Sequence, residues 1–277
     1  MALYLRDDFK KEWQGKDPYQ LLNEMPGQVF RQLEARRTYR FQFQGKNFFA
    51  KVHYGVGWRE IINNLLHFRL PVLGASNEWI ALNKLQVLGI DSMEPVAYGK
   101  KGYNPAKQKS FLITAALENM SSLEEICDKW KRTPPSYSMK KAIIEKLAEI
   151  SRTLHDNGIN HRDYYFCHFL IPDSILIEYA SNTKKRQPLR CYLIDLHRAQ
   201  IRKKLPERWR LKDLSGLFFS SMEYGFNQRD IYRFIRSYTG LPLKKSLITH
   251  HNFWHNLDKK AQKLFNRMKR KAGHPNY

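Results

Sequence analysis

The sequence has few cysteines and few acidic side chains. Its three cysteines, Cys127, Cys167 and Cys191, are odd in number and show no metal-like spacing, which suits a reducing compartment rather than a disulfide framework. Asp and Glu together number 26 against 48 Lys and Arg, giving a formal net charge of +22. Such an excess favours anionic partners: phosphates, acidic lipid headgroups, nucleic acid or an acidic protein.

Long apolar segments are also missing. The segment MALYLRDDFKKEW lacks the apolar centre of a signal peptide, and no run approaches the ~18 apolar residues of a transmembrane helix. We therefore expect a cytoplasmic protein that can still sit on a membrane surface. Residues 201–277 carry 18 basic and 5 acidic side chains, a net of +13. An apolar stripe in this region fits either an interfacial helix or a helix packed on its domain; the stripe consists of Leu257, Ala261, Leu264 and Met268.

Hydrophobic periodicity predicts the order of the elements. Alternation in TYRFQFQ and FFAKVHY around GKN predicts a hairpin over residues 38–54. Helical spacing predicts helices over 75–89 and 138–158, each ending in glycine. The segment SFLITAAL, residues 110–117, reads as a buried strand. Two further short strands are expected after the second helix, DSILIEY and CYLIDL.

The stretch HRDYYFCH, from His161 to His168, follows the end of the second helix. Phosphoryl transfer needs a carboxylate to accept the proton of the attacking hydroxyl, ligands for Mg²⁺ and a cation on the nucleotide phosphates. Asp163 is the candidate for the carboxylate, and Asp195, at the end of YLIDL, for a metal ligand. His168 occupies the position of the metal-binding Asn in the kinase pattern H-R-D-x-x-x-x-N. Imidazole is a poorer Mg²⁺ ligand than oxygen, so a packed core histidine is the alternative.

A lysine and a glutamate upstream complete the same pattern. Lys51 in FFAKV matches the kinase strand motif V-A-I-K, and Glu78 lies near the start of the next helix, where it can pair with the lysine. The order lysine, glutamate, buried strand, helix, HRD, hairpin and Asp is hard to obtain by chance. We predict an α+β, protein-kinase-like bilobal fold. Its β-rich, nucleotide-binding N-lobe would span residues 1–118, and its mainly helical C-lobe, with the catalytic loop and the metal site, residues 119–277.

Several features depart from protein kinases, and two of them bear on the nucleotide and the acceptor. No glycine-rich loop precedes the hairpin, so we hypothesise that Arg36 or Arg37 reaches the phosphates, since guanidinium groups pair well with phosphate oxygens; a solvated basic turn is the alternative. Asp213 stands 18 positions after Asp195 with no A-P-E between them. This short activation segment favours a small-molecule or glycan acceptor over a peptide. Asp213 is expected either to bind backbone amides near the catalytic loop or to cap a helix.

Taken together, these motifs resemble those of the lipopolysaccharide kinase family of the protein-kinase-like superfamily. The matching stretches span nearly the whole chain, and GVGW after the lysine strand and CHFL after HRD are the most specific. The resemblance implies ATP and Mg²⁺ dependence. It also implies phosphorylation of the first heptose of the lipopolysaccharide inner core on the cytoplasmic face of the inner membrane. The roles it implies are those proposed above for Asp163, Lys51, Glu78 and Asp195, and His168 looks native to the family.

Other functions remain open. One is a kinase for another inner-core sugar such as Kdo. A second alternative is a catalytically weak pseudokinase that acts as a binding module. The retained lysine and carboxylates argue against this alternative. Nucleic-acid binding is raised by the charge, but no helix-turn-helix, zinc-finger or RNA-binding aromatic motif is visible in the sequence. The charge suits a membrane rich in anionic glycolipid, and an acidic protein such as an acyl carrier protein would use the same field.

Overall fold

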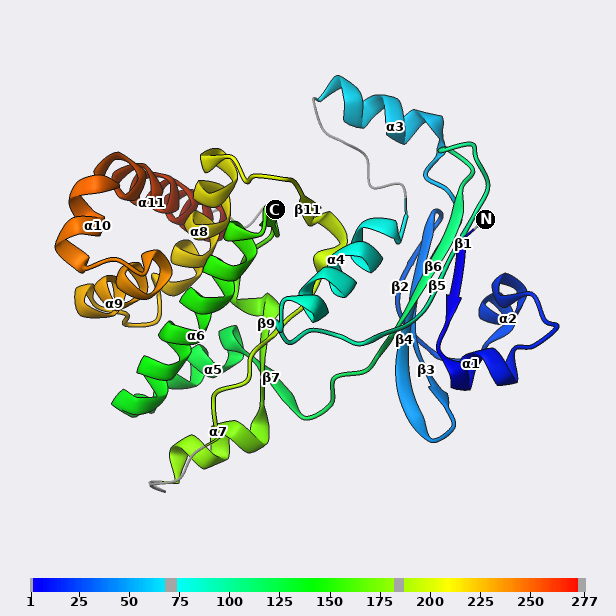
Figure 1. Ribbon diagram of the computed structural model, residues 1–277, viewed down its shortest axis with the longest axis horizontal. Helices are drawn as coiled ribbons and strands as arrows, with labels where there is room; N and C mark the ends of the chain where they lie inside the picture. The colour runs from blue at the N-terminus through cyan, green and yellow to red at the C-terminus, as the bar shows by residue number, and fades with distance from the viewer. Residues whose placement is uncertain (1, 68–73, 182–186, 274–277) are drawn as a thin grey trace. The chain divides into compact units, whose positions relative to one another are not determined.

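The computed structural model describes residues 2–67, 74–181 and 187–273. The chain forms two compact units. Unit 1 comprises Met1–Glu118 together with Asp195–Arg198, and unit 2 comprises Asn119–Ile194 and Ala199–Tyr277. Figure 1 shows that the large sheet belongs to unit 1 and that unit 2 is mainly helical.

Unit 1 is built on a six-stranded sheet with the order β1-β5-β6-β4-β3-β2, in which all neighbours are antiparallel. Its strands are β1 (Ala2–Leu5), β2 (Gln28–Leu33), β3 (Arg36–Phe43), β4 (Lys46–His53), β5 (Pro95–Lys101) and β6 (Lys109–Ala115). Its helices are α1 (Asp7–Glu12), α2 (Pro18–Glu24), α3 (Gly57–Leu66), α4 (Ser76–Val87) and the 3-10 turn η2 (Leu196–Arg198).

The predicted hairpin is confirmed as β3 and β4. Gln44 and Gly45 at its turn have φ values of 47° and 74°, and two positive φ angles are typical of the two-residue turns that match the twist of a hairpin. Tyr39 and Phe48 point to one face of the sheet and share a buried core with Phe9 of α1. Because side chains alternate along a strand, every second residue of β3 and β4 is left facing the opposite side.

Unit 2 combines helices with two small sheets, of order β10-β9-β7 and β11-β8. The strands are β7 (Met120–Ser122), β8 (Ile159–Asn160), β9 (Phe169–Pro172), β10 (Tyr192–Leu193) and β11 (Gln200–Ile201). The helices are α5 (Leu123–Trp130), α6 (Tyr137–Asp156), α7 (Asp173–Ala180), α8 (Glu207–Ser221), α9 (Gln228–Thr239), α10 (Leu243–Thr249), α11 (His251–Gly273) and the 3-10 turn η1 (Phe166–His168).

The predicted central helix is confirmed as α6. Ile143, Leu147 and Leu154 lie at helical spacing and are buried. Gly158 follows the helix with φ of 76°, and a side chain at this position would overlap the carbonyl oxygen of Arg202. Glycine therefore allows the chain to turn out of α6 and run directly beside β11, which places the following HRD segment.

One predicted strand is wrong. The segment DSILIEY forms helix α7, and the strand that pairs with β10 is β9. Ile175 and Tyr179, four residues apart, are buried, whereas Ile177 is exposed, which is a helical rather than an alternating pattern. Asp173 in the first turn complements the helix dipole. A short apolar run of this kind does not distinguish a strand from a buried helix.

The basic C-terminal helix α11 buries its apolar stripe. Leu257 and Ala261 are buried, Leu264 and Met268 are half-buried, and the helix packs on α8. Of the two alternatives, the structure therefore supports a helix packed on its unit. Throughout the described ranges, no helix combines the length and the apolar character needed to cross a membrane.

Candidate active site

The lysine and the glutamate predicted to pair are brought together in unit 1. Lys51 Nζ, from β4, lies 2.5 Å from Glu78 Oε1, from α4. Both side chains are largely shielded from solvent, and Glu78 is buried. A buried ion pair of this kind fixes the position of the ammonium group, because either charge alone would be costly in that environment.

Strand register identifies the other residues that share the Lys51 face of the sheet. Thr38 lies directly opposite Lys51, and Arg36 lies opposite His53, so all four side chains project to the same side. The Arg36 Nε and Thr38 Oγ1 atoms are buried and have no hydrogen-bond partner among the described residues. Buried donors are nearly always satisfied in folded proteins, so these two atoms leave unused hydrogen-bonding capacity on the Lys51 face.

The structure separates the two arginines that the sequence proposed together. Arg37 lies opposite Val52 and projects to the core side of the sheet, away from Lys51. Its guanidinium group donates to the carbonyl oxygen of Asn23 at 3.1 Å and stacks over the ring of Tyr39 at 4.3 Å. Of the two arginines, Arg36 is therefore the one that shares a face with Lys51.

Asp195 also belongs to unit 1. Its backbone has φ of 62°, in the left-handed region that non-glycine residues rarely adopt and that is often found at functional sites. His197 Nδ1 lies 2.5 Å from Asp195 Oδ1, and this contact orients the carboxylate. Burial, followed by the positive charges of Arg36 and Lys51, lowers the pKa of His53 to about 4. His53 therefore stays neutral near pH 7.

The HRD loop of unit 2 is anchored on a buried carboxylate. The backbone N–H groups of His161 and Arg162 donate to Asp213 Oδ2 and Oδ1 at 2.7 and 2.9 Å. Arg162, with φ of 77°, is another non-glycine residue in the left-handed region. Asp213 lies inside α8, which begins at Glu207. The expectation that Asp213 binds backbone amides is confirmed, and the helix-cap alternative is excluded.

A buried histidine and a tyrosine extend this anchor. His155 Nε2 lies 3.6 Å from Asp213 Oδ2, and the Nδ1 atom of the same ring lies 2.9 Å from the Tyr238 hydroxyl. Burial raises the pKa of Tyr238 to about 12, so its hydroxyl keeps its proton near neutral pH. The chain of contacts joins α6, α8 and α9 behind the loop, which holds the backbone around Asp163 in one conformation.

His168 contacts the HRD loop. Its Nδ1 atom lies 2.6 Å from the carbonyl oxygen of Asp163, so the ring N–H donates to that carbonyl. In the neutral ring this leaves Nε2 as the acceptor. Histidines that bind metal ions are commonly oriented in this way, although the bond also ties η1 to the loop.

Three residues of the unit 1 site were missed from the sequence: Thr38, His53 and His197. Alternation along β4 contained a signal for His53, which stands two residues after Lys51 and so faces the same side. The cross-strand position of Thr38 and the contact of His197 with Asp195 depend on register and turn geometry, which the sequence does not display.

The geometry defines a class of protein. Unit 1 carries a strand lysine paired with a helix glutamate, and unit 2 carries an HRD loop fixed by a buried aspartate. These elements in this order define a protein-kinase-like phosphotransferase. The chain matches the model of the Lipopolysaccharide kinase (Kdo/WaaP) family over residues 21–238 and belongs to that family. It is a kinase and, as such, uses ATP.

Relatives extend over nearly the full chain. A lipopolysaccharide core heptose(I) kinase WaaP of Escherichia coli K12 is 44% identical over 268 residues, covering 97% of this chain and 98% of the relative. The protein of the same name from Pseudomonas aeruginosa is 40% identical over 270 residues, covering 98% of each chain. A solved structure, "WaaP in complex with acyl carrier protein", has a TM-score of 0.80 at 36% identity and covers 96% of this chain and 100% of its own.

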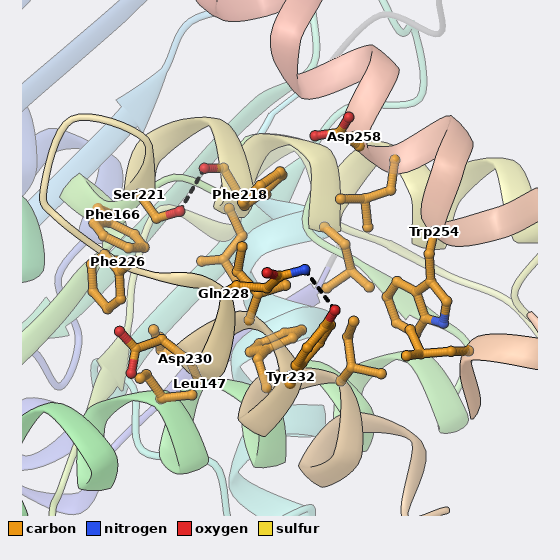
Figure 2. A pocket seen from close by; sticks show the side chains of 18 residues that line it. Leu147, Phe166, Phe218, Ser221, Phe226, Gln228, Asp230, Tyr232, Trp254 and Asp258 are labelled. Carbon is orange, nitrogen blue, oxygen red and sulfur yellow. Dashed lines mark hydrogen bonds between the residues drawn. The ribbon is translucent and has the colours of Figure 1, made fainter. Parts of the chain in front are cut away.

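Unit 2 also contains an apolar cavity of about 300 Å³. Figure 2 shows aromatic and aliphatic side chains from several helices turned toward it. Two of the polar side chains at the cavity are engaged: Gln228 donates to the Tyr232 hydroxyl, and Ser221 donates to the carbonyl oxygen of Phe218. Its volume is at the lower end of small-ligand pockets. The walls include Leu147, Phe166, Leu217, Phe226, Phe234 and Trp254.

Proposed function

We propose that this chain transfers a phosphoryl group from ATP to the first heptose of the lipopolysaccharide inner core. The observation that carries the proposal is the full-length identity of 40–44% to core heptose(I) kinases. The paired Lys51 and Glu78 and the anchored HRD loop support an active enzyme rather than a pseudokinase. The short segment between Asp195 and α8 supports a glycan rather than a peptide acceptor.

In this proposal unit 1 is the N-lobe and binds the nucleotide. Lys51, aligned by Glu78, pairs with phosphate oxygens. Because no glycine-rich loop precedes the hairpin, the Arg36 guanidinium group provides further contacts to the phosphates. The unsatisfied Arg36 Nε and Thr38 Oγ1 atoms on this face fit a phosphate group, because it offers several strong acceptors. Arg36 can also form two parallel bonds to one phosphate.

Asp195 and His168 are the proposed Mg²⁺ ligands. The Asp195 carboxylate suits Mg²⁺, because this ion prefers oxygen ligands and retains several waters. The His168 imidazole is the poorer Mg²⁺ ligand of the two. When bound, Mg²⁺ would neutralise phosphate charge. His197 orients the Asp195 carboxylate through the 2.5 Å contact.

Asp163 is the proposed general base, and unit 2 is the C-lobe that presents it. Its carboxylate would accept the proton of the attacking heptose hydroxyl. The two bonds from the loop backbone to Asp213 hold the loop still, so little reorganisation is needed as the proton moves.

The test is phosphoryl transfer by the purified protein to dephosphorylated inner-core oligosaccharides, with the product mapped by tandem mass spectrometry. We expect phosphate on the first heptose, and no product from an acceptor that ends at Kdo. Phosphate on Kdo would identify the alternative sugar kinase. ATP binding without transfer to either acceptor would identify a pseudokinase.

We further propose an acyl carrier protein as a partner and the cytoplasmic face of the inner membrane as the working site. The related solved complex contains an acyl carrier protein. Residues 201–277 carry a net charge of +13 that suits an acidic partner, and the apolar cavity of unit 2 suits a fatty acyl chain. Titration with acylated and unacylated acyl carrier protein tests this proposal. We expect tighter binding of the acylated form, and equal binding of the two forms would show that the cavity does not bind the acyl chain.

A further inference from the structure

Helix α3 turns its apolar side to solvent. Four large apolar side chains fall on one side of this helix, at positions 58, 62, 65 and 66, as the 3.6-residue period requires. Of the apolar residues of α3 whose burial is described, Ile61 is the buried one. Glu60 and Asn63 lie on the opposite side of the helix. The exposed fractions are 54% for Trp58, 52% for Ile62, 53% for Leu65 and 73% for Leu66.

The turn between β5 and β6 is fixed beside the start of α3. The Gly57 N–H donates to the carbonyl oxygen of Ala106 at 3.0 Å. Gly55, with φ of 104°, approaches so closely that a Cβ atom would lie 2.6 Å from the same oxygen. Both contacts depend on local backbone, so α3 and the turn form one continuous surface, and Figure 1 shows them side by side at one end of the sheet.

This turn is basic and carries an exposed aromatic side chain. Tyr103 at its tip is 96% exposed. Residues 95–109 contain no Asp or Glu. One of the lysines, Lys101, lies 4.0 Å from Asp17, and that pair is solvent-exposed. The lysines of the segment are Lys100, Lys101, Lys107 and Lys109.

We propose that α3 and the β5–β6 turn form an interfacial anchor that binds an anionic glycolipid bilayer. Trp58, Ile62, Leu65 and Leu66 enter the boundary between headgroups and acyl chains, Tyr103 lies at headgroup level, and the lysines contact anionic headgroups. The inference rests on the proposed function, since its acceptor is a membrane glycolipid.

A bilayer is the occupant that this combination of side chains fits. Interfacial helices combine Trp and Leu on one side with neighbouring cations, and Trp and Tyr concentrate at membrane interfaces. Lysines next to the apolar face are attracted to acidic headgroups. Because α11 packs its own stripe on α8, the exposed stripe of α3 is the better candidate for membrane contact.

The experiment is sedimentation of the full-length protein with vesicles of phosphatidylglycerol and phosphatidylethanolamine, compared with phosphatidylcholine, across a salt series. We expect the double variant Ile62→Ser/Leu65→Ser to lower vesicle affinity at least about 10-fold. Lys107→Glu/Lys109→Glu should lower it most at low salt. The matched controls, Ile177→Ser for exposed apolar area and Lys244→Glu/Lys245→Glu for charge, should bind as the wild type does. Equal loss in variant and control would overturn the proposal.

A second readout separates this inference from the proposed function. Turnover on a water-soluble, deacylated core acceptor should be unchanged in the Ile62→Ser/Leu65→Ser variant, whereas turnover on acceptor embedded in vesicles should fall. If wild-type protein binds vesicles but phosphorylates neither acceptor, the proposed function fails and the anchor stands. If turnover is intact and the variant binds vesicles normally, the anchor fails and the function stands.

The remaining occupants of this surface are outcomes of the same experiment. Loss of self-association, or of acyl carrier protein binding, with unchanged vesicle binding would make α3 a protein interface and overturn the proposal. Insertion of Trp58 into the bilayer can also be measured in the wild type, as quenching of tryptophan fluorescence by brominated lipid. This quenching should be weaker in Trp58→Phe, and identical quenching in the two proteins would place Trp58 outside the bilayer.

Discussion

The two units hold their functional groups by different physical means. In unit 1, side chains orient one another: Lys51 by Glu78, and Asp195 by His197. In unit 2, a buried carboxylate binds the backbone of the loop itself at His161 and Arg162. Side-chain pairs can be removed one at a time, whereas a backbone anchor is shared by the whole loop. Substitutions in unit 1 should therefore change nucleotide binding, and those in unit 2 should change turnover or stability.

The largest expected effect is on turnover, in unit 2. Asp163→Asn should lower kcat by roughly 10²-fold to 10⁴-fold, because the proposed general base is lost. The affinity for ATP, measured by calorimetry, should stay within a factor of about two. Asp156→Asn, an exposed carboxylate at the end of α6, is the matched control and should keep wild-type kcat. Near-normal turnover of Asp163→Asn would remove this residue from the mechanism.

A second prediction compares the anchors of the two units through stability. Asp213→Ala leaves the N–H groups of His161, which is buried, and Arg162, which is part-buried, without an acceptor, and an unsatisfied buried group costs about 1–3 kcal/mol. Its free energy of unfolding, from urea titration, should fall by about 2–5 kcal/mol. His197→Ala removes a partly exposed side chain and should change it by less than about 1 kcal/mol. Equal losses in the two variants would contradict the contrast between the units.

The two adjacent arginines provide a matched pair within unit 1. Arg36→Gln should raise KM for ATP about 10-fold or more, since a charge-assisted hydrogen bond contributes about 1.5–3 kcal/mol. Arg37→Gln, on the opposite face of the sheet, should leave KM within about twofold. The larger effect is expected for Arg36→Gln because we place the nucleotide on the Lys51 face of the sheet. A larger rise of KM for Arg37→Gln would place the nucleotide on the opposite face.

The smallest effect concerns pH. His53 has a pKa of about 4 in the folded protein against an ordinary value of 6.5. Between these values the unfolded chain binds a proton that the folded chain does not, so stability falls as the pH is lowered from 6.5 toward 4. The full interval corresponds to at most about 3.4 kcal/mol, since one pKa unit is about 1.36 kcal/mol. His53→Gln should show a flatter dependence of the unfolding midpoint on pH. Superimposable pH profiles would mean that His53 is not buried in its neutral form.

The sequence predicted the parts of the site that depend on motif order. Lys51, Glu78 and Asp213 could be assigned because each contact joins groups whose types and order are characteristic of kinases. Arg37 could not be distinguished from Arg36, because a shift of one residue along a strand reverses the face. Helix α7 was missed because a short apolar run is compatible with either element. Helical periodicity identified the stripe of α11, but periodicity alone does not say whether such a stripe is buried, as in α11, or exposed, as in α3.

The proposed heptose kinase activity is tested most directly by mass spectrometry of inner-core glycan from cells that lack this protein, complemented with the wild type or with Asp163→Asn. We expect the first heptose to lose its phosphate without the protein, to regain it with the wild type and not to regain it with Asp163→Asn. An unchanged heptose phosphate in the deficient cells, or a phosphate lost from Kdo instead, would contradict the proposed activity.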